Sequence, residues 1–221
     1  MFLEIDELLN PAEVAQLTAI SRQLKFEHGR VSNPAITTKD NLQAQRDGGA
    51  YNDSVRIAVE AFQRSRMFME FAFPKRIAPP LLTRYEPGMK YGAHADAAFM
   101  PLPPTSLRSD ISCTVFLSDP STYEGGELLV HVGTRPIPFK GKPGSAIIYP
   151  STMLHEVLPV RSGVRLVTIT FVESFIPMEH ERTLLYELSD ILALEGNKIG
   201  WDSRVRFEVA RNNLMRMWSM A

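Results

Sequence analysis

Three side chains of the kind that bind metal ions, His94, Asp96 and His155, are the residues of this chain best suited to chemistry. His94 and Asp96 are two positions apart, so in a strand or extended turn both point to the same side, with Cα atoms about 6.6 Å apart. Two imidazoles and one carboxylate on one face of an ion hold non-haem Fe(II) and leave the opposite coordination positions open. The three residues therefore predict an open iron site, provided that the fold brings His155 to the other two.

Arg165 follows His155 on what reads as the next strand. Two β-branched runs, residues 154–160 and 164–171, flank a three-residue connection that ends in glycine, and this pattern predicts a β-hairpin. In the register that such a turn favours, His155 lies opposite Ile169, and His155 and Arg165 share a face about 13 Å apart along the strands. An extended dicarboxylate such as 2-oxoglutarate fits this span, with its 2-oxo acid end on the metal and its far carboxylate paired with the guanidinium.

These residues belong to longer segments that resemble the Fe(II)/2-oxoglutarate-dependent dioxygenases of the prolyl-4-hydroxylase-like branch, and specifically the bacterial PKHD-type hydroxylases. The similarity runs nearly from end to end, and it is weaker over residues 35–43 and 213–218. The segments that carry it are 84–96 (RYEPGMKYGAHAD), 116–120 (FLSDP), 124–128 (EGGEL), 149–157 (YPSTMLHEV) and 163–165 (GVR).

The resemblance implies a role for particular residues. His94, Asp96 and His155 are implied to be the iron ligands and the catalytic centre. Arg165 is implied to bind the distal carboxylate of 2-oxoglutarate, and Tyr85 stands where related hydroxylases place a tyrosine hydroxyl on the same carboxylate. The implied enzyme hydroxylates a substrate with Fe(II), 2-oxoglutarate and O2, releases succinate and CO2, and has the family's dependence on L-ascorbate. Its substrate stays open between a peptide and a small molecule, since surface loops set specificity on such a scaffold.

Two other functions remain open at the level of the sequence. A non-catalytic metal-binding or sensing jelly roll could use the same three ligands without turnover, although it has no evident need of an inward-pointing Arg165. A cupin-type isomerase or hydrolase could use another divalent ion and ignore 2-oxoglutarate. Dependence on 2-oxoglutarate separates the dioxygenase from both alternatives.

Composition narrows the class of protein further. The formal net charge of -1 and the lack of a long Lys/Arg run give no electrostatic footprint for nucleic acid. The single cysteine, Cys113, excludes an intramolecular disulfide framework and favours a reducing compartment. The first residues carry acid where a signal peptide would carry base, and no apolar run approaches about 18 residues. We therefore expect a cytoplasmic enzyme with no membrane segment.

The coarse pattern of elements predicts an α+β fold. Asn10-Pro11-Ala12-Glu13 is typical of a helix start, and a second helix is expected from about Asp53 to Ser65. From Leu81 to Glu173 short β-rich runs alternate with Gly and Pro, which indicates a double-stranded β-helix, or jelly roll, backed by the N-terminal helices. Residues 177–221 return to helical spacing. We expect a dioxygenase domain over residues 1–176 and a helical extension over residues 177–221 through which a homo-oligomer could form.

Several residues that could do chemistry have a structural explanation instead. Cys113 lies in an apolar run and is expected to be a buried small hydrophobe. Gly125 and Gly126 predict a turn or bulge, since no helix start follows them. His131 is expected to face solvent or to be hydrogen-bonded on its strand. Tyr91 is left open between donation to a site carboxylate and packing.

Overall fold

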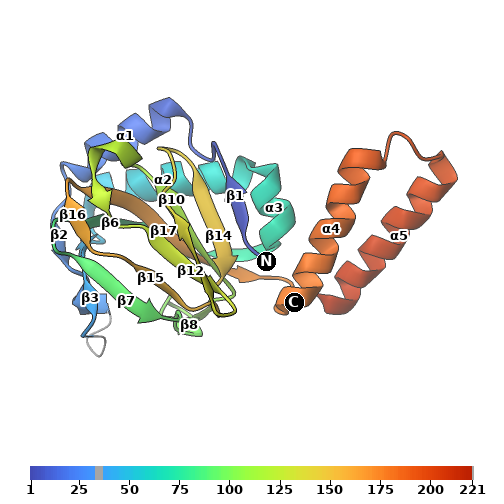
Figure 1. Ribbon diagram of the computed structural model, residues 1–221. Helices are drawn as coiled ribbons and strands as arrows, with labels where there is room; N and C mark the ends of the chain where they lie inside the picture. Colours follow the sequence, from blue (N-terminus) through green and yellow to red (C-terminus); the bar gives the residue numbers. More distant parts are fainter. Residues whose placement is uncertain (33–36, 221) are drawn as a thin grey trace.

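The computed structural model describes residues 1–32 and 37–220. Two antiparallel sheets lie face to face, helices cover the outer face of one of them, and a helical hairpin extends from one end (Figure 1). This arrangement confirms the predicted α+β fold with a jelly-roll core, flanking N-terminal helices and a C-terminal helical extension. Ala35 and Ile36, which belong to the N-terminal stretch of weaker family similarity, lie outside the described residues.

The larger sheet has eight strands, all paired antiparallel. Its longest strand, β17, pairs with β10 on one side and with both β6 and β5 on the other. The spatial order is β1 (Leu3–Ile5), β14 (Ala146–Pro150), β10 (Ile111–Phe116), β17 (Arg165–Ser174), β6 (Leu81–Tyr85), β4 (Leu42–Ala44) and β2 (Phe26–His28), with β5 (Pro74–Ile77) beside β17.

The smaller sheet has five antiparallel strands and carries two of the predicted metal ligands. Its order is β13 (Arg135–Phe139), β12 (Leu128–Val132), β15 (His155–Val157), β7 (Lys90–His94) and β3 (Lys39–Asp40). Two short pairs complete the strands: β11 (Glu124–Gly125) with β16 (Val160–Ser162), and β8 (Phe99–Met100) with β9 (Leu107–Arg108). Single 3₁₀ turns are η1 (Gly29–Ser32) and η2 (Pro120–Thr122).

The predicted hairpin between residues 154–160 and 164–171 is wrong. His155 begins β15, which pairs with β12 and β7 in the smaller sheet, whereas Arg165 begins β17 in the larger sheet. Ile169 lies opposite Thr114 and Leu81, and His155 lies opposite His94. The local pattern favoured pairing of neighbours in sequence, but the chain crosses from the smaller sheet to the larger one between β15 and β17, so the two runs belong to opposite layers of the sandwich.

The N-terminal helices begin largely as the sequence predicts. α1 (Pro11–Ser21) has a full capping box, in which Asn10 Oδ1 accepts from the Glu13 amide at 3.0 Å and Glu13 Oε2 accepts from the Asn10 amide at 2.9 Å. α2 (Gly48–Arg64) begins at Gly48 rather than near Asp53. The predicted start lies too late in the chain because the first turn, Gly-Gly-Ala, carries no start signal beyond Asp47 at the N-cap position. α3 (Arg66–Ala72) was not predicted; the Phe68 amide donates to Ser65 at its N-cap.

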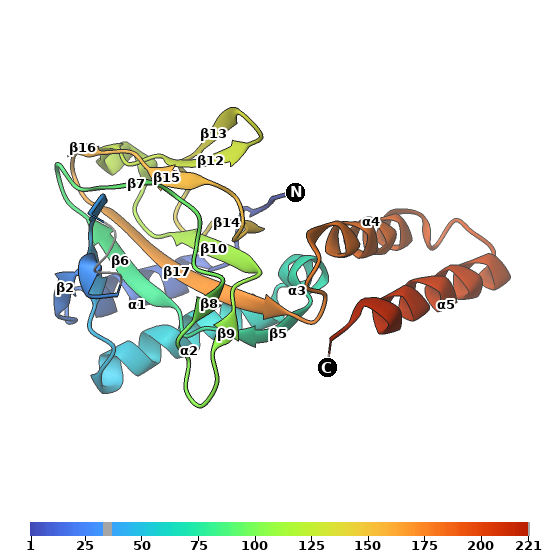
Figure 2. The ribbon, with the colours of Figure 1, turned by 90° about the horizontal axis from the view of Figure 1, so that it is seen from below.

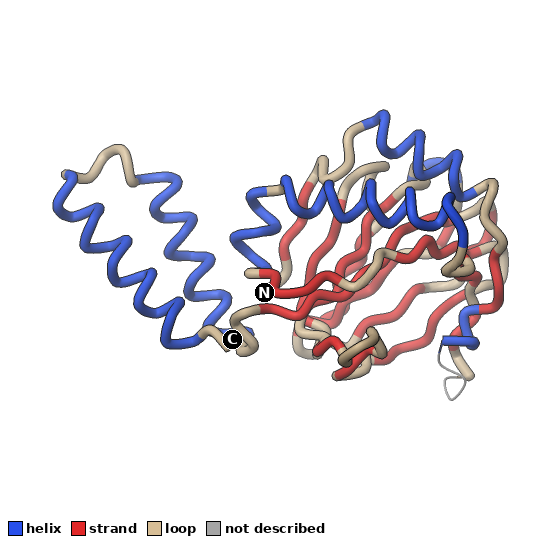
Figure 3. Tube along the Cα trace, turned by 180° about the vertical axis from the view of Figure 1, so that it is seen from behind, coloured by secondary structure: helices blue, strands red, loops and turns tan. Residues whose placement is uncertain are grey.

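Two hydrophobic clusters separate the layers. The first lies between the larger sheet and α1, α2 and α3, which cover its outer face (Figure 3). The second lies between the two sheets, so it borders both the larger and the smaller sheet. Its buried members are Tyr85, Phe116, Leu128, Val130, Phe139, Ile147, Tyr149, Val157, Val160 and Val167.

The C-terminal extension is an antiparallel pair of helices that projects from the sheets (Figures 1 and 2). It consists of α4 (Glu179–Glu195) and α5 (Trp201–Trp218). A small core of Phe73, Ile176 and Leu185 attaches its base to the jelly roll. Among the described residues, no helix combines the length and apolar character needed to cross a membrane.

Candidate active site

Three separate segments bring His94, Asp96 and His155 together. His94 ends β7, Asp96 follows two residues later, and His155 begins β15 directly opposite His94 in the ladder. One potential ligand atom from each residue lies within 4.8 Å of the other two. The two imidazole centroids are 4.2 Å apart, and His155 Nε2 is 3.7 Å from Asp96 Oδ2. The donor set and its spacing fit a two-histidine, one-carboxylate iron site.

Backbone carbonyls orient both imidazoles. The Nδ1 of His94 lies 2.8 Å from the carbonyl oxygen of Gly92, and the Nδ1 of His155 lies 2.9 Å from that of Met153. Because a carbonyl can only accept, each Nδ1 carries the proton and each Nε2 keeps its lone pair for a metal. Burial, reinforced by His155, lowers the pKa of His94 to about 4, so His94 is in its neutral, ligating form at neutral pH.

A chain of three buried serines orients the carboxylate of Asp96. Ser112 Oγ donates to Asp96 Oδ2 at 2.5 Å and lies 2.7 Å from Ser151 Oγ, to which Ser109 Oγ donates at 2.8 Å. With every donor directed toward the acid, Ser112 orients the carboxylate, whose remaining lone pairs stay available to a metal. Sequence reasoning missed this chain, since the serines lie on separate segments and no motif marks them.

One edge of the site is covered by an aromatic ring and a buried amine. Tyr91 stacks on His94, with ring centroids 3.6 Å apart and an interplanar angle of 17°. The Nζ of Lys39 is 5.3 Å from the Tyr91 centroid. Burial lowers the pKa of Lys39 to about 8, although Asp96 acts in the opposite sense. Tyr91 thus packs against His94, and Lys39 adds a cation that the sequence analysis did not single out.

Arg165 lies on the larger sheet and is almost completely buried, with 1% of its surface exposed. It is paired in register with Tyr85 of β6, and its guanidinium carbon is 5.0 Å from the Tyr85 ring centroid and 5.9 Å from that of Phe116. Among the described residues, its Nε has no hydrogen-bond partner. A buried cation with an unsatisfied donor indicates a place for an anionic ligand.

Gly126 makes room for the arginine. It has φ +67°, and a Cβ at this position would meet Arg165 Cδ at 3.1 Å and Val160 Cγ2 at 2.9 Å. Gly125 has φ +73°, and a Cβ at this position would lie 2.1 Å from the Pro159 carbonyl oxygen. The ladder between β11 and β16 shifts register here. The prediction of a turn or bulge at the two glycines is confirmed.

The metal half and the arginine half of the site border the same interior. The ring of Tyr149, a buried residue of the larger sheet, lies 5.1 Å from the His155 ring in an edge-on contact. Burial raises the pKa of Tyr149, and the nearby Asp96 and Tyr85 raise it further. Tyr149 therefore connects the larger sheet, with Arg165 and Tyr85, to the ligands of the smaller one. Arg165 reaches the site across the sandwich rather than along a hairpin.

The other candidate residues lie outside this site. His131 Nε2 is 3.7 Å from Glu156 Oε1 on the smaller sheet, and His28 Nε2 is 3.2 Å from Asp40 Oδ1. Cys113 is buried, as predicted, and burial raises the pKa of its thiol.

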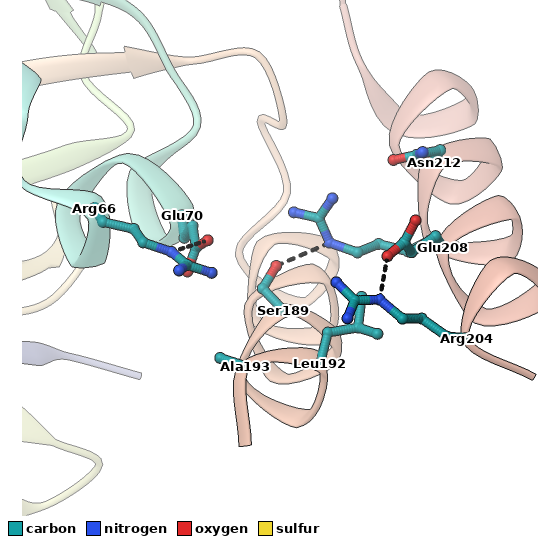
Figure 4. A pocket seen from close by; sticks show the side chains of 9 residues that line it. Arg66, Glu70, Ser189, Leu192, Ala193, Arg204, Glu208 and Asn212 are labelled. Atoms are coloured by element: carbon teal, nitrogen blue, oxygen red, sulfur yellow. Dashed lines mark hydrogen bonds and ion pairs between the residues drawn. The ribbon is translucent and has the colours of Figure 1, made fainter. Parts of the chain in front are cut away.

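A separate pocket of about 260 Å³ lies between α3, α4 and α5 (Figure 4). Its charged side chains are already satisfied: Arg66 Nε donates to Glu70 at 2.8 Å, and Arg204 Nε donates to Glu208 at 3.0 Å. None of its lining residues belongs to the His94–Asp96–His155 cluster.

Comparison with known proteins agrees with the fold and the donor set. Residues 80–173 match the 2OG-Fe(II) oxygenase superfamily. A PKHD-type hydroxylase of Sphingopyxis alaskensis is 50% identical over 212 residues, covering 96% of this chain and 97% of that protein. A prolyl-4-hydroxylase of Pseudomonas putida shares the fold with a TM-score of 0.57 at 17% identity, over 78% of this chain and 92% of that one. A prolyl hydroxylase of Trichoplax adhaerens, solved with a peptide fragment of the hypoxia inducible factor oxygen degradation domain, has a TM-score of 0.58 at 14% identity, over 83% and 86% of the chains.

A jelly roll with two imidazoles, a carboxylate and a buried arginine at one interior defines the class of Fe(II)/2-oxoglutarate-dependent oxygenases. Within that class, the chain belongs to the family of PKHD-type hydroxylases. It is accordingly an oxidoreductase that uses Fe(II), 2-oxoglutarate and O2. Bound iron supplies the redox chemistry that couples decarboxylation of 2-oxoglutarate to oxidation of a substrate.

Proposed function

We propose that His94, Asp96 and His155 are the Fe(II) ligands and catalytic centre of a hydroxylase, and that Arg165 and Tyr85 bind the distal carboxylate of 2-oxoglutarate. The observation that carries the proposal is the convergence of two imidazoles and a carboxylate within 4.8 Å, each held by its own hydrogen bond. Such pre-set ligands place three donors on one side of the ion and leave the other side to the co-substrate and O2.

The arginine supports 2-oxoglutarate rather than a simple metal function. A buried guanidinium with an orphaned Nε is costly unless a ligand pairs with it, and a carboxylate accepts two of its N–H groups in a fork. The hydroxyl of Tyr85 stands on the same face of the larger sheet because the two residues are directly opposed. A non-catalytic metal-binding protein would have no use for this second half of the site.

The substrate is proposed to be a peptide or a small molecule that approaches the metal from outside the sandwich. The Trichoplax relative was solved with a peptide fragment, which supports the peptide class. The formal net charge of -1 favours neither nucleic acid nor another polyanion as a partner.

The direct test is anaerobic titration of the Fe(II)-loaded protein with 2-oxoglutarate, observed through the metal-to-ligand charge-transfer band of the chelate. The wild type is expected to develop the band, and Arg165→Ala is expected to need far more 2-oxoglutarate. Absence of the band in both proteins would exclude the co-substrate site. A band with equal affinity in both would keep the metal site and reject the role of Arg165.

The proposal extends to the setting of the enzyme. We propose a dioxygenase domain of residues 1–176 and a distinct extension of residues 177–221, in a cytoplasmic protein whose turnover L-ascorbate supports. A single buried Cys113 is consistent with a reducing compartment. Self-association through the extension is supported by α5, which the structure describes completely and which has no buried residue. Light scattering at several protein concentrations tests the oligomeric state.

A further inference from the structure

A row of buried polar side chains follows the segment that joins β3 to β4. Lys39, Asn41 and Gln43 are 5%, 1% and 7% exposed, respectively, and their spacing of two places them on one side of an extended chain. β3 pairs with β7, the strand of His94, and β4 pairs with β6, the strand of Tyr85. The segment therefore crosses from the metal half of the site to the carboxylate half, and Asn41 is its midpoint.

Asn41 contacts the proposed co-substrate site through one hydrogen bond. Its Nδ2 donates to the hydroxyl oxygen of Tyr85 at 3.0 Å, and both side chains are buried. The ladder places Leu42 opposite Arg84, so Asn41 is next to Tyr85 across the strand pair.

The direction of that bond decides what Tyr85 can do. A phenol has one proton to donate, and here its oxygen accepts from Asn41. The guanidinium of Arg165 beside the ring has no acceptor, so it cannot take the Tyr85 proton. The hydroxyl proton of Tyr85 is therefore free for an acceptor placed between Tyr85 and Arg165. The Nε of Arg165, which has no hydrogen-bond partner among the described residues, needs an acceptor in the same place.

Gly29 leaves room for the Asn41 side chain. The Gly29 amide donates to the Asn41 backbone carbonyl at 2.7 Å, and a Cβ on Gly29 would lie 1.8 Å from Asn41 Oδ1. Only a glycine leaves room for that oxygen, which has no hydrogen-bond partner among the described residues. Rotation of the Asn41 amide would let Oδ1 accept the Tyr85 proton, so the Tyr85 hydroxyl would no longer be a donor for a ligand.

We propose that Asn41 is a positioning residue for the co-substrate, whose carboxamide keeps the Tyr85 hydroxyl as a hydrogen-bond donor to the distal carboxylate of 2-oxoglutarate. This inference rests on the proposed function, because it requires that carboxylate between Tyr85 and Arg165. It assigns to the β3–β4 segment a part in co-substrate binding in addition to its place in the two sheets.

A double-mutant cycle tests the inference. Isothermal titration calorimetry gives the Kd of 2-oxoglutarate for the full-length protein loaded with Mn(II), a redox-inert stand-in, in the wild type, Asn41→Ala, Tyr85→Phe and the double variant. With Tyr85 present, Asn41→Ala is expected to weaken 2-oxoglutarate binding roughly tenfold, the size expected for loss of the hydrogen bond from the Tyr85 hydroxyl to the charged carboxylate. In the Tyr85→Phe background it is expected to change Kd by less than about twofold, since the group it positions is absent.

Two further variants guard against a general structural effect. Asn41→Asp turns the donor into an acceptor for the Tyr85 proton, so it is expected to weaken binding more than Asn41→Ala. Gln43→Ala, a change at another buried position on the same side of the segment, is expected to show no coupling to Tyr85→Phe. Mn(II) affinity is expected to stay the same in all of these variants.

Equal losses for Asn41→Ala in both backgrounds, or no loss in either, would overturn the role of Asn41. Failure of the proposed function is a different result: the wild type would not bind 2-oxoglutarate, or Arg165→Ala would bind it equally well. If Asn41→Ala does not fold, Asn41→Leu, an uncharged change of similar size without a donor, replaces it in both backgrounds, and its loss must again vanish without the Tyr85 hydroxyl.

Discussion

The jelly-roll interior and the C-terminal helical hairpin use charged residues in opposite ways. In the interior, Arg165 and His155 are buried and approach their neighbours from different sheets. Beyond the base of the hairpin, ion pairs join residues three or four apart on one helix or turn, such as Arg204 with Glu208, and remain partly exposed, whereas at the base Arg182 is buried and Glu179 pairs with the N-terminus. Exposed pairs of this kind contribute about 0.3–0.5 kcal/mol each, whereas a buried charge must be matched or it destabilises the fold.

The apolar side chains are also more deeply buried in the jelly-roll interior than in the hairpin. Between the sheets they form one buried cluster, but the hairpin keeps only the small core at its base. Its large exposed side chains include Leu184, Ile191, Leu194, Trp201, Val205, Val209 and Met217. The difference teaches that the interior is specified by many non-local contacts that also shape the site, and it predicts that the hairpin can change without disturbing that site.

Removing a metal ligand is expected to have the largest effect. His155→Ala leaves two donors and is expected to abolish both iron retention and turnover, because neither His94 nor Asp96 can replace an imidazole across the ladder. Iron content after gel filtration and 2-oxoglutarate-dependent succinate release measure the two effects. His131→Ala, on the adjacent strand β12, is the matched control and is expected to retain iron. Substrate-coupled activity in His155→Ala would reject the ligand assignment.

Loss of the buried cation comes next. Arg165→Ala forfeits a charge-assisted fork worth about 1.5–3 kcal/mol, so the 2-oxoglutarate requirement is expected to rise about 10-fold to 150-fold. Iron retention should change little, since Arg165 lies on the other sheet from the histidines. Arg84→Ala, its half-exposed neighbour on β6, provides a control at which no such rise is expected. An unchanged requirement in Arg165→Ala would mean that another base holds the carboxylate.

The serine chain predicts a smaller, graded effect on metal affinity. Ser112→Ala removes the hydrogen bond that orients Asp96 and is expected to weaken Mn(II) binding about tenfold, the lower end for residues that support metal ligands. Ser109→Ala, three hydrogen bonds from the carboxylate, is expected to have a lesser effect. Metal titration followed by electron paramagnetic resonance measures both. Equal effects at the two serines would indicate general loosening of the interior instead of orientation of Asp96.

The sequence specified those parts of the site that depend on local spacing. His94 and Asp96 lie two apart, and the capping box at Asn10 and Glu13 formed as predicted. The strand pairing of His155 was predicted wrongly, because turn chemistry describes only neighbours along the chain. Which sheet a strand joins depends on burial of its whole inner face, a property of the assembled sandwich.

The polar partners within the site could not be predicted for a related reason. Ser112, Ser151 and Asn41 gain their roles only when strands distant in sequence are paired, and serine and asparagine are common in ordinary turns. The burial of Lys39 could not be predicted either, since a lysine on a short edge strand is normally a surface residue. Buried polar residues thus appear as signals only after the fold is known.

The smallest effect is expected in the hairpin, and it tests whether the two regions are independent. Ser189 Oγ donates to the Leu185 carbonyl at 2.9 Å and accepts from Arg211 Nε at 2.8 Å, which links α4 to α5 beside the pocket (Figure 4). Ser189→Ala should cost about 1 kcal/mol and lower Tm by roughly 2–4 °C. Calorimetry measures the shift, and Ser219→Ala, an exposed serine after α5, should leave Tm unchanged. Affinity for Mn(II) and 2-oxoglutarate should not change in Ser189→Ala, because the hydrogen bonds of this pair in the described part of the chain stay within α4 and α5. A parallel loss of either affinity would show that the hairpin supports the site after all.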